Sequence, residues 1–188
     1  MFFYWLDMKT FDARAVANLI LDEATRKSRR ISNLSLQKLL YFSHGLYLIR
    51  HNCPLVTGYF EAWKLGPVHP TVYESFKSAA DQIIDFRANR FNLVTQRSES
   101  IAKIDDPDCL QTVSQVVDAY GQLPPGRLVE LSHAANAPWS FVVDNSKMRP
   151  MLGLRITDSI IREKFKFHKF SVGNVPTAGE LDEDAPFA

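Results

Sequence analysis

The stretch Ser35-Leu-Gln-Lys-Leu-Leu-Tyr-Phe-Ser-His-Gly-Leu-Tyr-Leu-Ile-Arg-His51 decides how this chain folds. Its bulky apolar residues cover most of the circumference of a helix, and only a few polar residues interrupt them. A helix that is apolar nearly all round is a buried one. We therefore predict a central helix from Ser35 to about His51, around which the other elements pack.

The segment after this helix changes its period and continues the same unit as far as Tyr73. Tyr59 to Lys64 alternate bulky apolar with polar or small residues, and Gly66-Pro67 ends the alternation, as in a short strand or hairpin arm. Pro70 can then open a helix at its first turn, where its missing N–H is not needed. The sequence predicts a mainly α fold: a compact helical domain around a buried central helix, with a small β-hairpin or short antiparallel sheet.

Capping residues mark other helices along the chain. Asp12 precedes apolar positions with the 3.6-residue period, and Asp106-Pro107 supplies a cap followed by a proline at the first helical position. A shorter helix is predicted from Arg127 to about Ala134, ending near Pro138-Trp139. A last helix is predicted from Thr157 to Lys166, capped by Thr157 or Asp158.

A chain of 188 residues is expected to form one domain, which we assign to residues 12–172. Residues 1–11 are a lead-in: either a hydrophobic segment that packs on the first helix or, for the first seven residues, an artefact of a natural start at Met8. Residues 173–188 have two prolines, four acidic residues and no Lys or Arg. This composition is typical of a disordered acidic tail.

The composition argues against several classes of partner. The 22 basic and 21 acidic residues give a net charge of +1, whereas duplex nucleic-acid binders usually carry a marked basic excess. The longest apolar stretch, residues 39–49, is far too short to span a membrane, and the N-terminal apolar run lacks the basic leader of a signal peptide. Two cysteines fit a reducing compartment. We therefore expect a cytoplasmic protein with no membrane attachment and no DNA binding.

One basic cluster stands apart from this even charge. Arg26, Lys27, Arg29 and Arg30 follow the first predicted helix, and cations are favourable at the negative end of a helix dipole. A solvated helix end accounts for the cluster. A basic patch that binds a partner, or DNA for autoregulation, is the alternative.

The sequence offers little for a metal or a cofactor. His44 and His51 share a helix face but stand about 10 Å apart along its axis, which is too far to chelate one ion. His51 and Cys53 lack a second ligand pair at zinc-site spacing. Neither cysteine lies in a recognisable Cys/His signature, and no glycine-rich phosphate loop occurs. We predict no metal site and no cofactor.

The chemically dense patch is the strand-turn unit that contains Glu61, Trp63, Lys64 and His69. Glu61 with Lys64 or His69 could serve acid–base chemistry on a small molecule. The competing interpretation is structural: Glu61 pairs with a basic neighbour while Trp63 fills the core. We favour the structural interpretation, and hence a protein that is not an enzyme, because nothing nearby supplies a nucleophile or a cofactor.

Three blocks of this sequence resemble a known family. Ser35-Leu-Gln-Lys-Leu-Leu-Tyr-Phe-Ser-His-Gly45 is similar to the LQKLLYFAHGW signature of the Panacea antitoxin domain, found in phage-associated GepA-like and SocA-like proteins. Residues 60–73 contain Phe-Glu-Ala-Trp-Lys-Leu-Gly-Pro-Val followed by Pro and Tyr, which resembles the second element of that family. Residues 131–139 contain Leu-Ser-His and Pro-Trp, which resembles the third. The order and spacing of the blocks also fit.

The resemblance implies an antitoxin. Family members are encoded beside varied toxic proteins and neutralise them by direct binding, so the implied partner is a cognate protein toxin encoded by an adjacent gene. SocA-like members instead deliver the toxin to a ClpXP-type protease, which makes a proteolytic adaptor the alternative. The family has no established catalytic residues, so none is carried over. Ser43, Leu46 and Leu65 depart from the family pattern and could each alter a local contact surface.

Interface hot spots favour Trp, Tyr and Arg, so we look for the partner-binding residues among aromatic and cationic side chains. Core packing competes with this role, above all for the two tryptophans. Residues 81–105 mix strand formers with Asn and are predicted to be irregular or short strands; they are an equal candidate for partner specificity. The candidate contact residues are Tyr59, Phe60, Trp63, Lys64, Tyr73 and Trp139.

Overall fold

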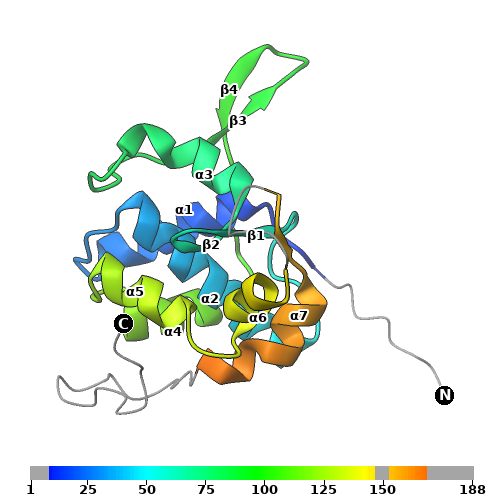
Figure 1. Ribbon diagram of the computed structural model, residues 1–188. Coiled ribbons are helices and arrows are strands. Elements are labelled where there is room, and N and C mark those ends of the chain that lie inside the picture. The colour runs from blue at the N-terminus through cyan, green and yellow to red at the C-terminus, as the bar shows by residue number, and fades with distance from the viewer. Residues whose placement is uncertain (1–8, 147–152, 169–188) are drawn as a thin grey trace.

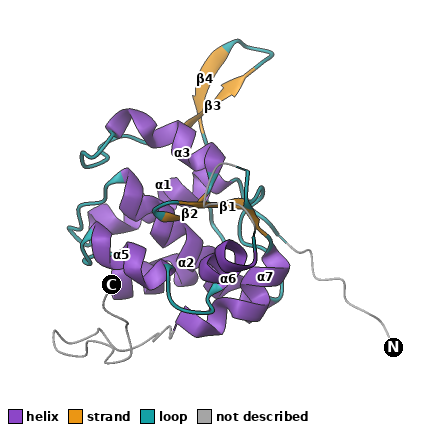
Figure 2. Cartoon of the chain, in the orientation of Figure 1, coloured by secondary structure: helices purple, strands orange, loops and turns teal. Residues whose placement is uncertain are grey.

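The computed structural model describes residues 9–146 and 153–168. Helices build the body of the molecule, and one pair of strands projects from it (Figure 1, Figure 2). The helices are α1 (Ala13–Arg26), α2 (Asn33–His51), α3 (Pro70–Phe76), α4 (Pro107–Tyr120), α5 (Pro125–Ser132), α6 (Pro138–Asn145) and α7 (Asp158–Lys164). The strands are β1 (Phe60–Trp63), β2 (Gly66–Val68), β3 (Asn89–Asn92), β4 (Arg97–Ser100) and β5 (Arg155–Ile156). The fold is mainly α, as predicted.

Helix α2 lies at the centre of this body, and nearly every side chain from Asn33 to Leu48 is buried. Ser32 caps the helix, because its hydroxyl oxygen accepts a hydrogen bond from the Ser35 amide. The helix packs against α1, α3, α4, α5 and α7. The predicted central helix is confirmed, and it begins two residues earlier than predicted.

Helices α1 and α4 pack against each other and against α2. Asp12 accepts a hydrogen bond from the Arg14 amide at 2.8 Å, and Asp106 accepts one from the Cys109 amide at 3.0 Å. Both caps satisfy backbone donors that have no partner within the helix. The two helix starts predicted from Asp12 and Asp106 are therefore confirmed.

Aromatic rings fill the space around α2. The Tyr41 ring lies edge-on to Phe60 of β1, with centroids 5.5 Å apart, and 6.0 Å from Phe165 near the C-terminal end of the described chain. Phe42 stacks on Tyr120 of α4 at 5.3 Å. Such ring pairs contribute about 0.5–1.5 kcal/mol each beyond the area they bury. These rings tie the central helix to the sheet, to α4 and to the C-terminal helices.

A three-stranded antiparallel sheet with the order β2-β1-β5 lies against α2. Glu61 is paired with Val68, Trp63 with Gly66, and Phe60 with Ile156. The predicted hairpin of β1 and β2 is confirmed. The third strand was not predicted, because β5 has only two residues and is too short to show a period.

The C-terminal helices differ from the prediction at one point. Pro138-Trp139 begins α6 rather than ending the preceding helix, because a proline fits the first turn of a helix. Thr157 caps α7, and the chain continues from it as a 3-10 helix, Phe165–His168. The predicted last helix is confirmed.

The expectations for the start of the chain at Met8 and for the acidic tail at residues 173–188 lie outside the described residues. Of the lead-in, Phe11 is tied to the domain: its amide donates to the Leu55 carbonyl and its carbonyl accepts from the Thr57 amide, both at 2.9 Å. Within the described ranges, no helix is both long and apolar enough to cross a membrane.

Candidate functional site

The turn between β1 and β2 brings three of the candidate contact residues together. The Trp63 indole donates a hydrogen bond to Glu61 Oε2 at 2.7 Å, and the Trp63 carbonyl accepts one from the Trp139 indole at 2.9 Å. The Trp63 ring packs on Tyr73 of α3 with centroids 4.8 Å apart. We define the Trp63 surface as Trp63, Lys64, Leu65, Tyr73 and Trp139.

The rings of this surface are half-buried, while Lys64 and Leu65 at the turn are exposed. Both tryptophans therefore hold the hairpin in place while part of each residue stays exposed. The expectation that Glu61 pairs with a basic neighbour is wrong. Among the described residues Glu61 forms no ion pair, and its carboxylate accepts from the Trp63 indole instead, because the two side chains share one face of β1.

The other two aromatic candidates lie at the start of β1. Phe60 is only 1% exposed and belongs to the core, so it cannot meet a partner directly in this structure. Tyr59 is 38% exposed, and the Arg155 guanidinium lies 4.0 Å from its ring centroid. This cation–π contact orients the Tyr59 ring beside the sheet. Of the pair, only Tyr59 is available to a partner.

The three residues of the enzyme hypothesis, Glu61, Lys64 and His69, are not brought together. The His69 ring lies 5.4 Å from the Phe60 ring on the core side of β1, whereas Glu61, the next residue of the strand, faces the other way. Lys64 is exposed at the turn. His69 Nε2 donates to the Thr57 carbonyl at 2.9 Å, and burial lowers the pKa of His69, which keeps it neutral. The sheet separates the acid from the base.

Lys38 of α2 is a fully buried lysine that the sequence presented only as a polar interruption of an apolar helix. Its Nζ donates to the Pro67 carbonyl on β2 at 2.9 Å, and burial lowers its pKa to about 7. His133 stacks on Trp139 with centroids 3.7 Å apart. Burial, and then the charge of nearby Lys38, lower the pKa of His133 to about 4. The three sequence blocks thus meet around Lys38, beneath the Trp63 surface.

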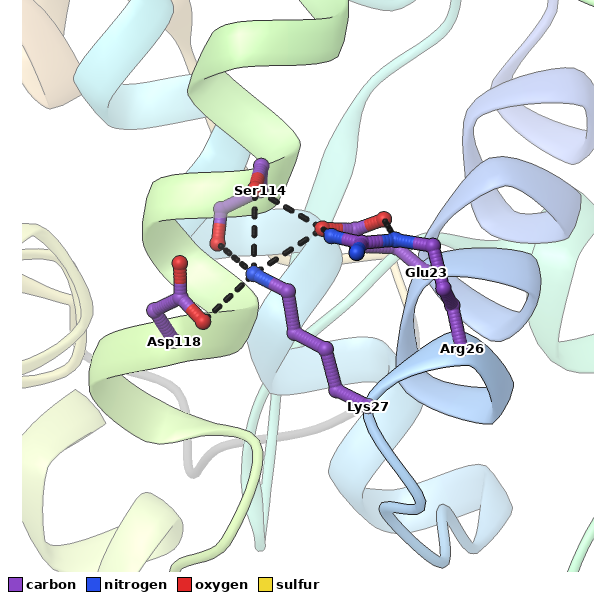
Figure 3. Close-up of polar contacts among 5 residues, drawn as sticks. All are labelled: Glu23, Arg26, Lys27, Ser114 and Asp118. Carbon is purple, nitrogen blue, oxygen red and sulfur yellow. Dashed lines mark hydrogen bonds and ion pairs between the residues drawn. The ribbon is translucent and has the colours of Figure 1, made fainter.

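Half of the basic cluster after α1 is neutralised by carboxylates (Figure 3). Glu23 pairs with Arg26 at 2.7 Å and with Lys27 at 2.9 Å, and Lys27 also pairs with Asp118 of α4. The Ser114 hydroxyl donates to Glu23 at 2.7 Å. Hydrogen bonds, first of all from Arg26, hold the pKa of Glu23 at about 2. Lys27 and Glu23 therefore tie α1 to α4, whereas Arg26 pairs within α1. Arg29 and Arg30 alone are a weak basis for a DNA-binding patch.

Strands β3 and β4 form a hairpin arm that projects from the body (Figure 1). They occupy the region predicted to be irregular or short strands, and the strands are confirmed. Phe91, Leu93 and Val94 on this arm are 62%, 83% and 93% exposed. Large apolar side chains with such exposure contribute little to the fold, so they are available to a partner.

The described residues contain no group of three His, Cys, Asp or Glu side chains that could hold a metal ion. His44 uses both ring nitrogens within the fold, since Nδ1 accepts from the Val56 amide at 3.4 Å and Nε2 lies 3.1 Å from Asp158. Cys53 and Cys109 are buried free thiols. Burial raises the pKa of Cys109 to about 12, which disfavours the thiolate that a nucleophile requires.

Most of the buried polar groups described above bond within the fold, and aromatic and aliphatic side chains are exposed on a turn and on an arm. This combination is typical of a small helical protein-binding domain. The chain matches the family described as "Antitoxin SocA-like, Panacea domain" over residues 36–140. It is also 41% identical to "Antitoxin SocA" of Caulobacter vibrioides (strain NA1000 / CB15N) over 180 residues, which cover 96% of each chain. No solved structure gives a significant match. The chain therefore belongs to the SocA-like antitoxin family with a Panacea domain, and this membership supports an antitoxin function.

Proposed function

We propose that this chain is an antitoxin that neutralises a cognate protein toxin by direct binding, without a catalytic step of its own. The observation that carries the proposal is its similarity to antitoxin SocA along nearly the whole length of both chains. The toxin is proposed to be the product of an adjacent gene, and the cytoplasm is the proposed place of action. Exposed apolar side chains on two parts of the domain supply the means of binding.

The Trp63 surface is the first candidate for toxin contact. Tryptophan and tyrosine in partly desolvated surroundings are common hot spots of protein interfaces. The hydrogen bonds of Trp63 and Trp139 fix both residues before a partner arrives, so little side-chain entropy is lost on binding. Leu65, which is 50% exposed, adds an aliphatic contact at the tip of the turn. Tyr59 can extend this surface, whereas Phe60 supports it from the core.

The β3–β4 arm is the second candidate. Burial of apolar area contributes about 25 cal/mol per Å², and Leu93 and Val94 expose most of their area. A hairpin also presents strand edges that can pair with an extended segment of a partner. The arm could therefore supply both affinity and a choice between partners.

Co-expression with the product of each neighbouring gene tests the proposal. The toxin should arrest growth when it is expressed alone, and this chain should restore growth and co-purify with it. Leu65→Asp and Val94→Asp each place a charge on an exposed candidate position without disturbing the core. Leu110→Asp is the matched control, because Leu110 is also exposed but lies on α4. The proposal fails if no neighbouring product is both toxic and held in a complex.

A proteolytic adaptor is the alternative within the same class. The feature that favours it is the acidic sequence of residues 173–188, which could contact a ClpXP-type protease. Deletion of these residues would then lengthen the half-life of the toxin in cells while toxin binding stayed unchanged. An unchanged half-life would reject the adaptor role and leave neutralisation by binding.

A further inference from the structure

Two shallow hollows adjoin at the loop between α1 and α2. One, of about 420 Å³, lies between the end of α1 and residues 83–87, and the other, of about 410 Å³, lies between the loop and residues 121–125. Both are lined by Ser28, Arg29, Arg30 and Ile83, so they form one concave face. We define the Arg29 face as Leu21, Ala24, Arg29, Arg30, Ile31 and Ile83.

Three arginines and two carboxylates line the two hollows. Arg29 and Arg30 form no ion pair with any described residue, whereas Arg87 at the edge of the Arg29 face pairs with Asp22 at 2.7 Å. The Arg29 Nε atom is buried and has no hydrogen-bond acceptor among the described residues. A buried N–H without an acceptor is energetically unfavourable, because it has lost its hydrogen bonds to water. The Arg29 guanidinium can therefore bind an acceptor from outside the described part of the chain.

The acceptor that fits is a carboxylate on a peptide. Guanidinium groups bind carboxylates through paired, charge-assisted hydrogen bonds. The walls beside the arginines are aliphatic, with Leu21 and Ile31 buried and Ile83 39% exposed. An acidic peptide with one aliphatic side chain matches both parts of the face. The segment Glu180-Leu-Asp-Glu-Asp184 of this chain has that composition, with four carboxylates around Leu181.

The tail begins close enough to reach the face. His168 Nδ1 lies 2.9 Å from the Leu131 carbonyl, so the last described residue is beside α5. Pro125 at the start of α5 lines the second hollow, about 9 Å along the helix from Leu131. The twelve residues from His168 to Glu180 span up to about 40 Å when extended. A tether of this kind gives an effective concentration in the millimolar range, so weak ion pairs suffice.

We propose that residues 180–184 bind in cis to the Arg29 face, with carboxylates on Arg29 and Arg30 and Leu181 against the aliphatic wall. Asp81 and Asp85 also line the hollows, but neither forms an ion pair with Arg29 or Arg30 among the described residues. Both guanidinium groups therefore remain open to the carboxylates of the tail. This contact is separate from the Trp63 surface and from the arm. It does not depend on toxin binding.

Paramagnetic relaxation in the full-length chain tests the contact. A nitroxide on Gln122→Cys sits at the rim of the second hollow, and Cys53 and Cys109 are buried, so the label goes to the new thiol. The amide signals of residues 180–184 should lose at least half of their intensity at low salt. They should recover in 0.5 M salt, because ion pairs are screened. A label on Thr95→Cys at the arm should leave these signals unchanged.

Two sets of variants assign the effect to charge. Arg29→Gln with Arg30→Gln should restore the tail signals, whereas Arg162→Gln, an exposed arginine on α7, should not. Reversal of the four tail carboxylates to lysine should restore them without any change in the domain. Tail signals that stay sharp beside the Gln122 label, or broadening that survives loss of both arginines, would overturn the proposal. A mixture of spin-labelled chains and unlabelled chains separates binding within one copy from binding between copies. If the tail signals broaden only through a label on another copy, the occupant of the face is a second copy and the proposal is overturned.

Discussion

The ammonium nitrogen of Lys38 on α2 lies 2.9 Å from the carbonyl oxygen of Pro67 on β2, fully inside the core. The bond ties the central helix to the hairpin that carries Trp63. No carboxylate forms an ion pair with this lysine among the described residues, so burial favours its neutral form and lowers its pKa to about 7. Lys38 thus positions the hairpin and at the same time makes stability depend on pH.

Replacing Lys38 with methionine should remove that dependence. The unfolded chain keeps the Lys38 proton up to a pKa near 10.5, and the folded chain only up to about 7. Between these values the unfolded state binds more protons, so the free energy of unfolding rises with pH. When the pH falls from 8.5 to 6, the free energy of unfolding of the wild type should fall by about 2 kcal/mol more than that of Lys38→Met. Urea denaturation at both pH values measures this, and parallel profiles would contradict it.

His168 should weaken the fold in acid. Its Nδ1 donates to the Leu131 carbonyl, so Nε2 accepts from the Tyr41 hydroxyl at 2.9 Å, which fixes a neutral ring. Burial lowers the pKa of His168 from 6.5 to about 4. Between these values the unfolded state takes up a proton that the folded state refuses, so stability falls as pH falls.

From pH 6.5 to pH 4, the free energy of unfolding of the wild type should therefore fall by about 3 kcal/mol more than that of His168→Gln. Denaturation curves across this range give the slopes. His51→Gln is the comparison, because His51 is an exposed histidine at the end of α2, outside the core. Equal slopes for His168→Gln and wild type would show that the buried ring is not responsible.

Gly66 cannot accept a side chain. Its φ is +94°, and a Cβ atom there would lie 2.8 Å from Lys38 Nζ and would overlap Ser132 Oγ. Gly66→Ala should destabilise the fold by about 1–3 kcal/mol, because strain and overlap add. Gly126→Ala is the matched control: a Cβ on Gly126 meets nothing within 4 Å, and it should stabilise α5 by up to about 1 kcal/mol. Thermal unfolding distinguishes the two, and equal shifts would reject the explanation.

The Glu23 cluster should stabilise the packing of α1 on α4. Glu23→Gln leaves Arg26 and Lys27 without their shared carboxylate and should cost about 1–3 kcal/mol. Glu130→Gln removes the partner of Arg127 in an exposed pair and should cost less than about 1 kcal/mol. Urea denaturation at neutral pH compares them, and an equal or smaller loss for Glu23→Gln would contradict this role.

Features that depend on neighbouring residues were predictable from the sequence. The all-round apolar pattern of α2 and the caps Asp12, Asp106 and Thr157 act within one or two turns of helix, and the structure has them as expected. Strand β5 was missed because its pairing with β1 is set by residues about ninety positions away. The start of α6 at Pro138 was misread, because the same residue type can end one helix or begin another.

The candidate site was harder to predict because it combines three separate segments. Trp63, Tyr73 and Trp139 come from β1, α3 and α6, and no local pattern reports that they meet. The spacing of two residues does predict that Glu61 and Trp63 share a strand face. Whether a cation from another segment also reaches Glu61 depends on the tertiary packing, which that spacing does not report. The burial of Phe60 and Lys38 follows from the packing of the hairpin on α2, which the alternation of β1 alone could not assign.

Calorimetric titration of the purified chain with its purified cognate toxin, which we propose to be the product of an adjacent gene, tests the central claim most directly. Direct neutralisation predicts a stoichiometric complex with a dissociation constant below about 1 μM, equivalent to roughly 8 kcal/mol. Leu65→Asp or Val94→Asp should weaken it at least about tenfold, while Leu110→Asp leaves it unchanged. A toxin that this chain neutralises in cells but does not bind in the calorimeter would contradict the claim.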